Sequence, residues 1–371
     1  MDRVPIVCDY GSGFSKVGFA GNKDPLGVFP TVLGKLRHDR VFVGLEEEDW
    51  FIGSEVYQNL EKLSLHYPIS RGAIHSWDDL EKIWHYSFYH LLHSNPKEHP
   101  LMLSEPPLIP FSVKEIASQI LFETFKVPAL HLANQGVLAM FASGHTSGMT
   151  IESGEGMTYF VPVIDGCPLS RSTTKLDIAG QDLTFHLMHL LDRGNLLLGT
   201  ADRECIRNMK EKCCFVAQDF DKEKESSRAL SQQKTFQLPD GREVSLGHEA
   251  FLCPEALFQT SLIGRSTEGI HMFTLRTITS CDRIFWKTLL GHILLSGGTS
   301  CFPGLKQRLQ REVVRLACSY FHVKVATSPY AKNSAWTGGS ILCSLSTFKD
   351  LWVTRKEYED MGASIFSRRS F

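Results

Sequence analysis

The chain has 371 residues, of which 43% are hydrophobic, and its formal net charge is −2 at pH 7. This length suits two domains with a core each, and the balanced charge excludes a bulk basic surface for nucleic acid or anionic membrane. We expect no secretory signal, no membrane span and no zinc site, and the ten scattered cysteines predict a reducing compartment, either cytosol or nucleus.

Residues 4–21 predict a strand, a tight turn with two glycines and a second strand. We expect Gly11 and Gly13 there because the φ angles of such a turn become positive and because bare backbone lets a ligand approach closely. The turn amides would form a concave anion site, Lys16 would add a positive charge, and Asp9 would hold Mg²⁺ through water. This is the chemistry of a phosphate clasp, but taken alone the motif favours a plain β-hairpin.

Strands and helices alternate over the following residues, as is typical of layered α/β domains. Strands are expected at 28–33, 100–103 and 130–132, and helices after Ser76, after Ser112 and over 135–142. An acid follows each of the two serines by three residues, which predicts capping boxes. The apolar face of the first helix predicts core packing rather than a cofactor site, and it comprises Leu80, Ile83, Trp84, Phe88 and Leu91.

Residues 149–161 repeat the first motif, with a strand, an acid, a glycine-rich turn and a strand. Glu152 takes the place that Asp9 has in the first hairpin. The repetition predicts an internal duplication. Two such hairpins would grip a nucleoside triphosphate from both sides.

The remaining elements carry weaker signals. His186 and His189, on a helix that follows residue 176, are predicted to be two surface histidines rather than a metal pair. A further helix is expected after Asp202, an exposed charged segment over 219–234, and a hairpin turn over 238–242.

A third glycine-rich stretch covers residues 293–304 and predicts a buried strand, a Gly-Gly turn and a helix start at Pro303. Bare backbone at this turn would let a flat heterocycle lie close by, although a plain strand-to-helix turn is an equally good reading. The core face of the helix is predicted to comprise Leu305, Leu309, Val313 and Leu316. The pair Gly338 and Gly339 predicts a tightly packed helix start.

Nine strings in the same order carry a resemblance to a known family. They are GSGFSKVGFAG from Gly11, YPISRG from Tyr67, WDDLEKIWHYSFY from Trp77, FASGHTSG from Phe141, KEKCCFVAQDF from Lys210, LPDG from Leu238, CPEALFQ from Cys253, LLSGGTSCFPG from Leu294 and GGSILCSLSTF from Gly338. From residue 4 to Phe371 the chain resembles the actin family. Its drift is similar to that of the actin-like proteins of male germ cells.

The resemblance implies the two-lobed ATPase fold of actin, Hsp70 and sugar kinases, in which duplicated α/β domains surround a cleft for ATP or ADP with Mg²⁺ or, alternatively, Ca²⁺. It implies a small-lobe core of residues 1–30, 68–142 and 334–371 with an insertion at 31–67. It also implies a large-lobe core of residues 143–178 and 266–333 with an insertion at 179–265.

The resemblance also implies the site residues. The phosphate-binding set is Gly11, Ser12, Gly13, Lys16, Ser153, Gly154, Glu155 and Gly156. The adenosine-binding set is Gly180, Lys210, Glu211, Gly298, Thr299, Phe302 and Lys332. Asp9 and Glu152 would reach the metal through water, and Gln135, Glu152 and Tyr159 would form the catalytic set.

Departures from the family pattern predict slow hydrolysis. The family has Asp where this chain has Glu152 and Glu155. One extra C–C bond moves each carboxylate by about 1.5 Å, and the octahedral coordination of Mg²⁺ tolerates little displacement of its ligands. The family has His where this chain has Tyr159, and a phenol is a poor base at neutral pH. We therefore expect ATP to be bound but hydrolysed more slowly than by conventional actin.

Other departures lie at assembly positions. The acidic run 46–49 replaces an apolar-tipped loop, Arg265 stands at the tip of the plug loop 262–265, Cys167 replaces an aromatic residue and Arg71 replaces a histidine. An unpaired buried charge at an interface would cost several kcal/mol, so actin-like self-polymerisation is doubtful.

A groove for partners is implied by residues that match the site where actin-binding proteins insert an amphipathic helix. They are Gly144, Thr146, Leu342, Leu345, Thr347 and Leu351, and ordinary core packing would explain the leucines equally well.

The favoured function is a nucleotide-binding structural subunit or adaptor of a cytoskeletal, sperm-head or nuclear assembly, located in the cytoplasm and cytoskeleton or in the nucleus. Its partners would be actin-binding-type proteins, actin or other actin-related proteins, without direct nucleic-acid contact. The alternatives are a dynamic filament-forming ATPase and, ranked last, a small-molecule kinase of the same fold.

Overall fold

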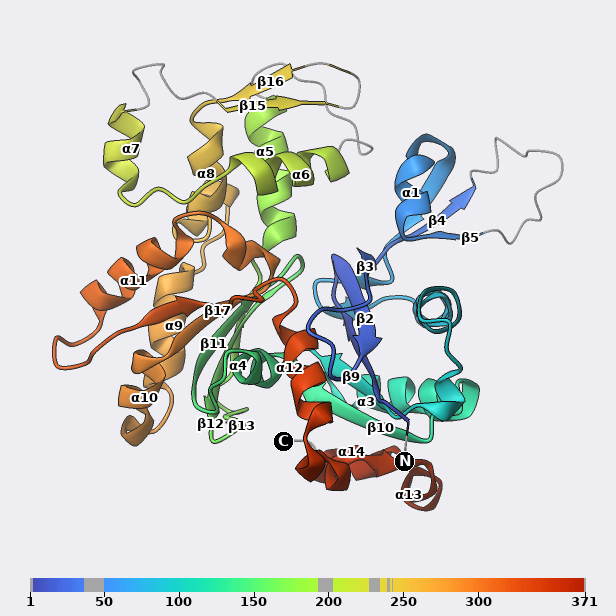
Figure 1. Cartoon of the computed structure of the whole chain (residues 1–371). Coiled ribbons are helices and arrows are strands. Elements are labelled where there is room, and N and C mark those ends of the chain that lie inside the picture. Colours follow the sequence, from blue (N-terminus) through green and yellow to red (C-terminus); the bar gives the residue numbers. More distant parts are fainter. Residues whose placement is uncertain are drawn as a thin grey trace. The chain divides into compact units, whose positions relative to one another are not determined.

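The computed structural model describes residues 3–36, 50–192, 203–226, 234–238, 241 and 243–369. The chain divides into two compact units. Unit 1 comprises Met1–Ser147, Val163–Thr173 and Ser328–Phe371, and unit 2 comprises Gly148–Pro162 and Thr174–Thr327. Two large mixed β-sheets flanked by helices, shown in Figure 1, confirm the expected α/β fold class. The finer division into four parts stays a prediction.

The first sheet has the strand order β19-β10-β9-β1-β2-β3. Its strands are β1 (Ile6–Tyr10), β2 (Phe14–Phe19), β3 (Gly27–Pro30), β9 (Leu101–Glu105), β10 (Ala129–Asn134) and β19 (Val353–Thr354). Strands β1 and β2 form the expected antiparallel hairpin, and β1, β9 and β10 run parallel to one another. The carboxyl ends of three neighbouring strands therefore meet at one edge of the sheet.

The second sheet repeats this order as β13-β12-β11-β17-β18. Its strands are β11 (Gly148–Ser153), β12 (Thr158–Ile164), β13 (Cys167–Pro168), β17 (Ile293–Ser296) and β18 (Val325–Thr327), with β14 (Thr174–Leu176) paired to β12. Strands β11, β17 and β18 are parallel, as β1, β9 and β10 are in the first sheet. The repeated order agrees with the predicted internal duplication.

Residues 28–33 were expected to form one strand, but they contribute to two different strands. Strand β3 lies at the edge of the first sheet, but β4 (Leu33–Leu36) joins a separate sheet with β5 (Trp50–Ile52) and β6 (Leu63–His66). The acidic run at 46–49 lies outside the described residues.

The smaller elements of unit 1 are α1 (Ser54–Gln58), β7 (Ile69–Ser70), β8 (Ala73–Ile74), α13 (Arg355–Met361) and α14 (Ile365–Arg369).

Of the two predicted capping boxes, the first is confirmed only in its serine cap. The Ser76 side chain accepts a hydrogen bond of 3.2 Å from the Asp79 amide at the start of α2 (Trp77–His85). The predicted apolar face continues into the π-helical segment Tyr86–Leu91 and is buried apart from the half-buried Leu91. The cap at Ser112 is wrong, because α3 (Phe111–Gln119) begins earlier, with Pro110 as its N-cap. Ser112 is therefore the second residue of the helix and lies within its first turn, where it cannot serve as the N-cap.

Helices α4 (Gln135–Ala142) and α12 (Ser334–Ser344) pack closely against each other in unit 1 (Figure 1). A Cβ atom at Gly338 would lie only 1.8 Å from the Leu138 carbonyl oxygen. Glycine is therefore required at this helix crossing, which confirms the tight packing predicted from the glycine pair. The Asn134 side chain caps α4 by accepting from the Gly136 amide at 2.9 Å.

Seven helices belong to the described part of unit 2. They are α5 (Gly180–Asp192), α6 (Arg203–Cys213), α7 (Phe220–Ser226), α8 (Glu249–Glu255), α9 (Ile270–Thr279), α10 (Trp286–Gly291) and α11 (Leu305–Leu316). The charged segment that begins at residue 219 contains α7, a helix the composition did not predict. Strands β15 (Lys234–Gln237) and β16 (Glu243–Leu246) form an antiparallel pair around the predicted turn, of which Pro239, Asp240 and Arg242 lie outside the described residues.

Two predictions about unit 2 side chains need correction. His186 is buried, with 8% of its surface exposed, whereas His189 is exposed as predicted. His186 lies on the inward face of α5, one residue before the buried Leu187. Leu305, Leu309 and Val313 are buried as predicted, but Leu316 is 39% exposed because it ends helix α11.

All ten cysteines belong to the described residues, and none of them forms a disulfide. Among the helices in this part of the chain, none combines the length and the apolar composition that crossing a membrane requires.

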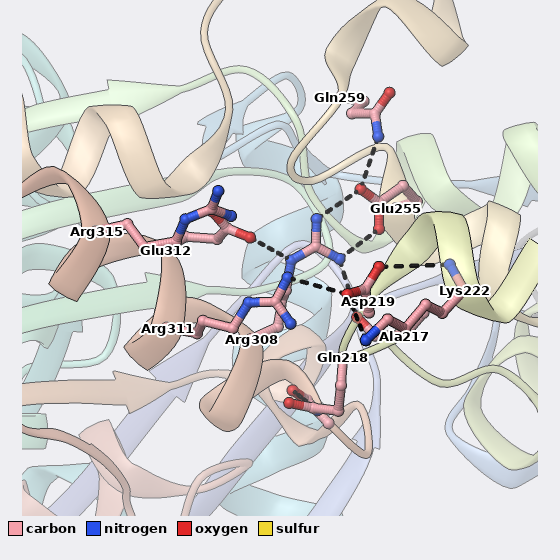
Figure 2. A network of polar contacts seen from close by, with 11 residues as sticks. Ala217, Gln218, Asp219, Lys222, Glu255, Gln259, Arg308, Arg311, Glu312 and Arg315 are labelled. Carbon is pink, nitrogen blue, oxygen red and sulfur yellow. Dashed lines mark hydrogen bonds and ion pairs between the residues drawn. The ribbon is translucent and has the colours of Figure 1, made fainter.

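A buried ion pair ties helix α11 to helix α8 (Figure 2). The guanidinium of Arg308 donates to both carboxylate oxygens of Glu255 at 3.1 Å, to the Ala217 carbonyl at 2.9 Å and to Glu312 Oε1 at 2.8 Å. Gln259 donates a further hydrogen bond of 3.0 Å to Glu255. Burial raises the pKa of the Glu255 carboxyl, while Arg308 opposes this shift. Either charge would be costly to bury without the other.

We expect Arg308→Met to lower the free energy of unfolding by about 3 kcal/mol, because Glu255 would be left buried without its partner. Removing both charges in Arg308→Met/Glu255→Met should recover much of that loss. Arg315→Met is the matched control, because the side chain of Arg315 is 66% exposed, and it should have little effect. Urea unfolding followed by circular dichroism measures all three, and a double variant less stable than Arg308→Met would contradict the account.

Candidate functional site

The turns of the two long hairpins are closed in the same way. In the first, the Gly11 amide donates to the Phe14 carbonyl at 3.1 Å, and in the second the Gly154 amide donates to the Met157 carbonyl at 3.1 Å. The two amides after each of these glycines donate no hydrogen bond within the described part of the chain. Each turn therefore offers two successive N–H groups to an anion.

The reason expected for the turn glycines is wrong in part. Positive φ angles occur at other glycines, but not at the glycines of either turn. A Cβ atom at Gly154 would meet nothing closer than 3.9 Å, and one at Gly298 would find no atom within 4 Å. Neither backbone conformation nor internal packing demands glycine at these two positions. What glycine provides there is open space beside bare backbone, which is the second reason given from the sequence.

Asp9 is the centre of a polar cluster in unit 1. Its Oδ2 atom accepts from Lys16 Nζ at 3.0 Å, and its Oδ1 atom accepts from Gln135 Nε2 at 2.9 Å and from Ser104 Oγ at 2.5 Å. Asp9 and Lys16 face each other in the β1–β2 register, and their side chains are 5% and 15% exposed. The structure thus brings together three residues that the sequence predicted for the site.

Ser104 is a member of this cluster that the sequence reasoning missed. It is the penultimate residue of strand β9, which lies between β1 and β10 and runs parallel to both. The parallel register places its hydroxyl beside Asp9 and within 3.3 Å of the Gln135 amide nitrogen. The only sequence signal was its place at the carboxyl end of a short apolar strand, where ligands of α/β sheets commonly bind.

In unit 2 a second cluster joins the hairpin turn to the start of α5. The Thr299 hydroxyl donates to the Gly154 carbonyl at 2.7 Å, the Gly180 amide donates to the same carbonyl at 3.0 Å, and the Lys210 ammonium donates to the Gly180 carbonyl at 2.6 Å. A Cβ atom at Gly180 would lie 2.7 Å from Glu155 Oε2. Hydrogen bonds therefore connect residues from four segments that the sequence analysis considered separately.

Two contacts in this cluster were not predicted. Arg203, at the start of α6, lies 3.8 Å from Glu155 Oε1. The Lys210 ammonium also donates to the Thr184 hydroxyl at 2.9 Å. A cation therefore accompanies the acidic residue of the turn in unit 2, as Lys16 accompanies Asp9 in unit 1.

The other predicted residues are less closely joined. Ser153 shares a buried hydroxyl contact of 2.8 Å with Thr158, whose own hydroxyl donates to the Ile178 carbonyl, so the Ser153 side chain is engaged inside unit 2. Phe302 is buried and Glu211 is exposed. Lys332 belongs to unit 1, whereas the rest of the adenosine set belongs to unit 2.

Tyr159 occupies the position in the second hairpin that Lys16 occupies in the first. Burial, with a smaller contribution from the charge of Asp177, raises the pKa of Tyr159 to about 12. Its hydroxyl is therefore protonated at neutral pH and can donate a hydrogen bond, but it cannot serve as a general base.

The described residues hold no group of three or more His, Cys, Asp or Glu side chains that would bind a metal ion by themselves. A divalent cation here would need oxygen ligands from a bound phosphate and from water, which is how Mg²⁺ is commonly held beside nucleotides. The carboxylates at the two strand ends, Asp9 and Glu152, fit that arrangement through water. The bare turn amides fit the phosphate.

The residues predicted to bind partners lie on the surface of unit 1. Gly144, Thr146, Leu345 and Thr347 are exposed, Leu345 with 48% of its surface. Leu342 and Leu351 are half-buried against the core cluster that contains Phe348 and Trp352. Ordinary core packing therefore does not account for Leu345, although the other two leucines do contribute to the core.

His131 lies beneath this surface. Its Nδ1 atom is 3.1 Å from the Leu351 carbonyl and therefore carries the proton, and its ring centroid is 4.8 Å from that of Phe348. Burial lowers the pKa of His131 to about 4. Between pH values of about 4 and about 6.5 the imidazole of His131 is therefore neutral in the folded protein, whereas in the unfolded chain it binds a proton.

We expect the free energy of unfolding to fall by about 3 kcal/mol as the pH is lowered from about 6.5 to about 4, because only the unfolded chain binds the proton in that window. His131→Asn keeps a donor for the Leu351 carbonyl and should remove this component of the pH dependence. The control His75→Asn changes an exposed histidine and should leave the pH dependence as in the wild type. Urea unfolding followed by tryptophan fluorescence suits the test because Trp50, Trp77, Trp84, Trp336 and Trp352 belong to unit 1. Equal pH dependence in wild type and His131→Asn would refute it.

Comparison with known proteins identifies the fold that carries these clusters. The family model described as Actin matches residues 2–371, which is nearly the whole chain. The match includes both glycine hairpins, the Gly-Gly turn after β17 and the carboxyl-terminal helices. The chain therefore belongs to the actin family.

Proposed function

We propose that the protein binds one Mg-ATP or Mg-ADP through both hairpins and acts as a structural subunit or adaptor of a cytoskeletal or nuclear assembly. The observation that carries the nucleotide proposal is the repeated turn, closed by the same hydrogen bond in each unit and leaving two amides bare. The acid and the cation beside each turn support it, because a metal-bound phosphate needs both kinds of charge.

We expect Gly154→Ala and Gly298→Ala to weaken ATP binding at least fivefold without lowering thermal stability. Each added methyl would enter open space, so it obstructs only a ligand. Gly291→Ala is the matched control, because its Cβ would also meet no atom within 4 Å but it lies at the end of α10. Titration with a fluorescent ATP analogue measures the affinities, and equal affinity in all three variants would argue against the proposal.

The same site is proposed to hydrolyse ATP slowly. The Tyr159 phenol cannot accept a proton at neutral pH, and the carboxylates of Glu152 and Glu155 extend one bond further than the aspartates of the family pattern. Gln135 remains to orient water, although here its amide donates to Asp9. In this proposal the nucleotide mainly stabilises the folded chain by mass action.

Single-turnover measurements of phosphate release should therefore give a slower rate than conventional actin gives. Tyr159→His should raise the rate at least tenfold, because an imidazole with a pKa near 6.5 can accept a proton at neutral pH. Tyr159→Phe is the control and should leave the slow rate unchanged. A wild-type rate equal to that of conventional actin, or a large loss in Tyr159→Phe, would contradict the proposed role.

The assembly role rests on surface chemistry in each unit. Arg265 and Cys167 are exposed at positions where the family pattern is apolar or aromatic, which opposes actin-like contacts between copies. The exposed Leu345, Gly144 and Thr146, which match the partner site of the family pattern, suit an amphipathic helix of a partner. Sedimentation of the purified protein after addition of Mg²⁺ and salt separates this role from that of a filament-forming ATPase. An adaptor that does not polymerise would stay in the supernatant, whereas filaments would pellet.

A further inference from the structure

The second turn carries an acid on one of the residues whose backbone would bind an anion. The Glu155 amide donates no hydrogen bond within the described part of the chain, and the Glu155 carbonyl accepts from the Gln181 amide at 2.8 Å, which joins this residue to the start of α5. A phosphate bound to the Glu155 amide would lie close to the carboxylate of the same residue. Because like charges repel, the site needs a group that compensates this carboxylate.

Arg203 is placed to compensate it. One of its guanidinium nitrogens lies 3.8 Å from Glu155 Oε1, and the two side chains are only 19% and 14% exposed, so solvent screens the pair less than it screens a surface pair. The other carboxylate oxygen lies against Gly180, where a Cβ atom would come within 2.7 Å of it. The guanidinium carbon is 5.4 Å from the ring centroid of Phe185 on α5, a distance at which the ring attracts the cation.

We propose that Arg203 is a positioning residue of the nucleotide site. It holds the carboxylate of Glu155 beside the starts of α5 and α6 and neutralises its charge, so that a nucleotide phosphate can bind the Glu155 amide. The ring of Phe185 keeps the guanidinium in place. The inference rests on the proposed function, and in it Arg203 acts through Glu155 rather than by contacting the phosphate itself.

Removing the arginine tests this role. We expect Arg203→Met to weaken the binding of Mg-ATP at least fivefold, because the carboxylate then repels the phosphate without compensation. Glu155→Gln/Arg203→Met should bind Mg-ATP at least threefold more tightly than Arg203→Met, because the repelling charge is gone. Adenosine lacks phosphate and should bind Arg203→Met and the wild type equally. Competition with a fluorescent ATP analogue measures all of these affinities.

The matched control is Arg276→Met. Arg276 also pairs with a glutamate, at 3.2 Å, and its guanidinium carbon is 4.1 Å from the ring centroid of a phenylalanine, but it lies on α9. This variant should bind Mg-ATP as the wild type does. If Arg203→Met does not fold, Glu155→Gln alone is decisive: it leaves the arginine charge uncompensated beside the turn and should bind Mg-ATP at least twofold more tightly than the wild type.

Three results would overturn the role of Arg203 while the wild type still binds Mg-ATP. A double variant as weak as Arg203→Met would mean that the arginine contacts the phosphate directly. Equal affinity of Arg203→Met and the wild type, or an equal loss of adenosine binding, would mean that the ion pair is only structural. Weaker binding by Glu155→Gln would mean that the carboxylate assists the nucleotide. A wild type that does not bind Mg-ATP would instead refute the proposed function, and this role with it.

Discussion

A single backbone hydrogen bond at each glycine turn is the constraint on which the rest of the site depends. It closes the turn and leaves the next two amides without a hydrogen bond within the described part of the chain, and it occurs at 3.1 Å in both units. In unit 1 Lys16 lies beside Asp9 near the strand end, and in unit 2 Arg203 lies beside Glu155 in the turn itself. No side chain fills the space at Gly154 or Gly298. The cations, the bare amides and this open space are what the proposed phosphate binding would use.

The order of the strands explains how separate segments reach the turns. In the first sheet β9 and β10 run parallel to β1, so Ser104 and Gln135 arrive beside Asp9 from the carboxyl ends of neighbouring strands. In the second sheet β17 runs parallel to β11, so the turn that carries Thr299 arrives beside Gly154. Two sheets with the same strand order therefore build two polar clusters from different residues, as expected of a duplication followed by divergence.

Local patterns in the sequence predicted what local physics determines. The hairpins, the cap at Ser76 and helix α4 follow from turn residues, capping groups and apolar spacing within a few positions. The predicted cap at Ser112 is wrong because the helix begins at Phe111, with Pro110 as its N-cap. The predicted exposure of His186 is wrong because burial depends on which helices pack around α5. The contacts of Ser104 with Asp9 and of Arg308 with Glu255 join residues 95 and 53 positions apart, and no local pattern encodes such registers.

The central claim is that both hairpins serve one nucleotide, and calorimetric titration with Mg-ATP tests it most directly. The account predicts one nucleotide per chain in the wild type, and it predicts that Lys16→Met in the first hairpin and Gly154→Ala in the second each weaken that same single site. Two independent sites, each lost with its own hairpin variant, would contradict the claim, and so would one site that is indifferent to either change.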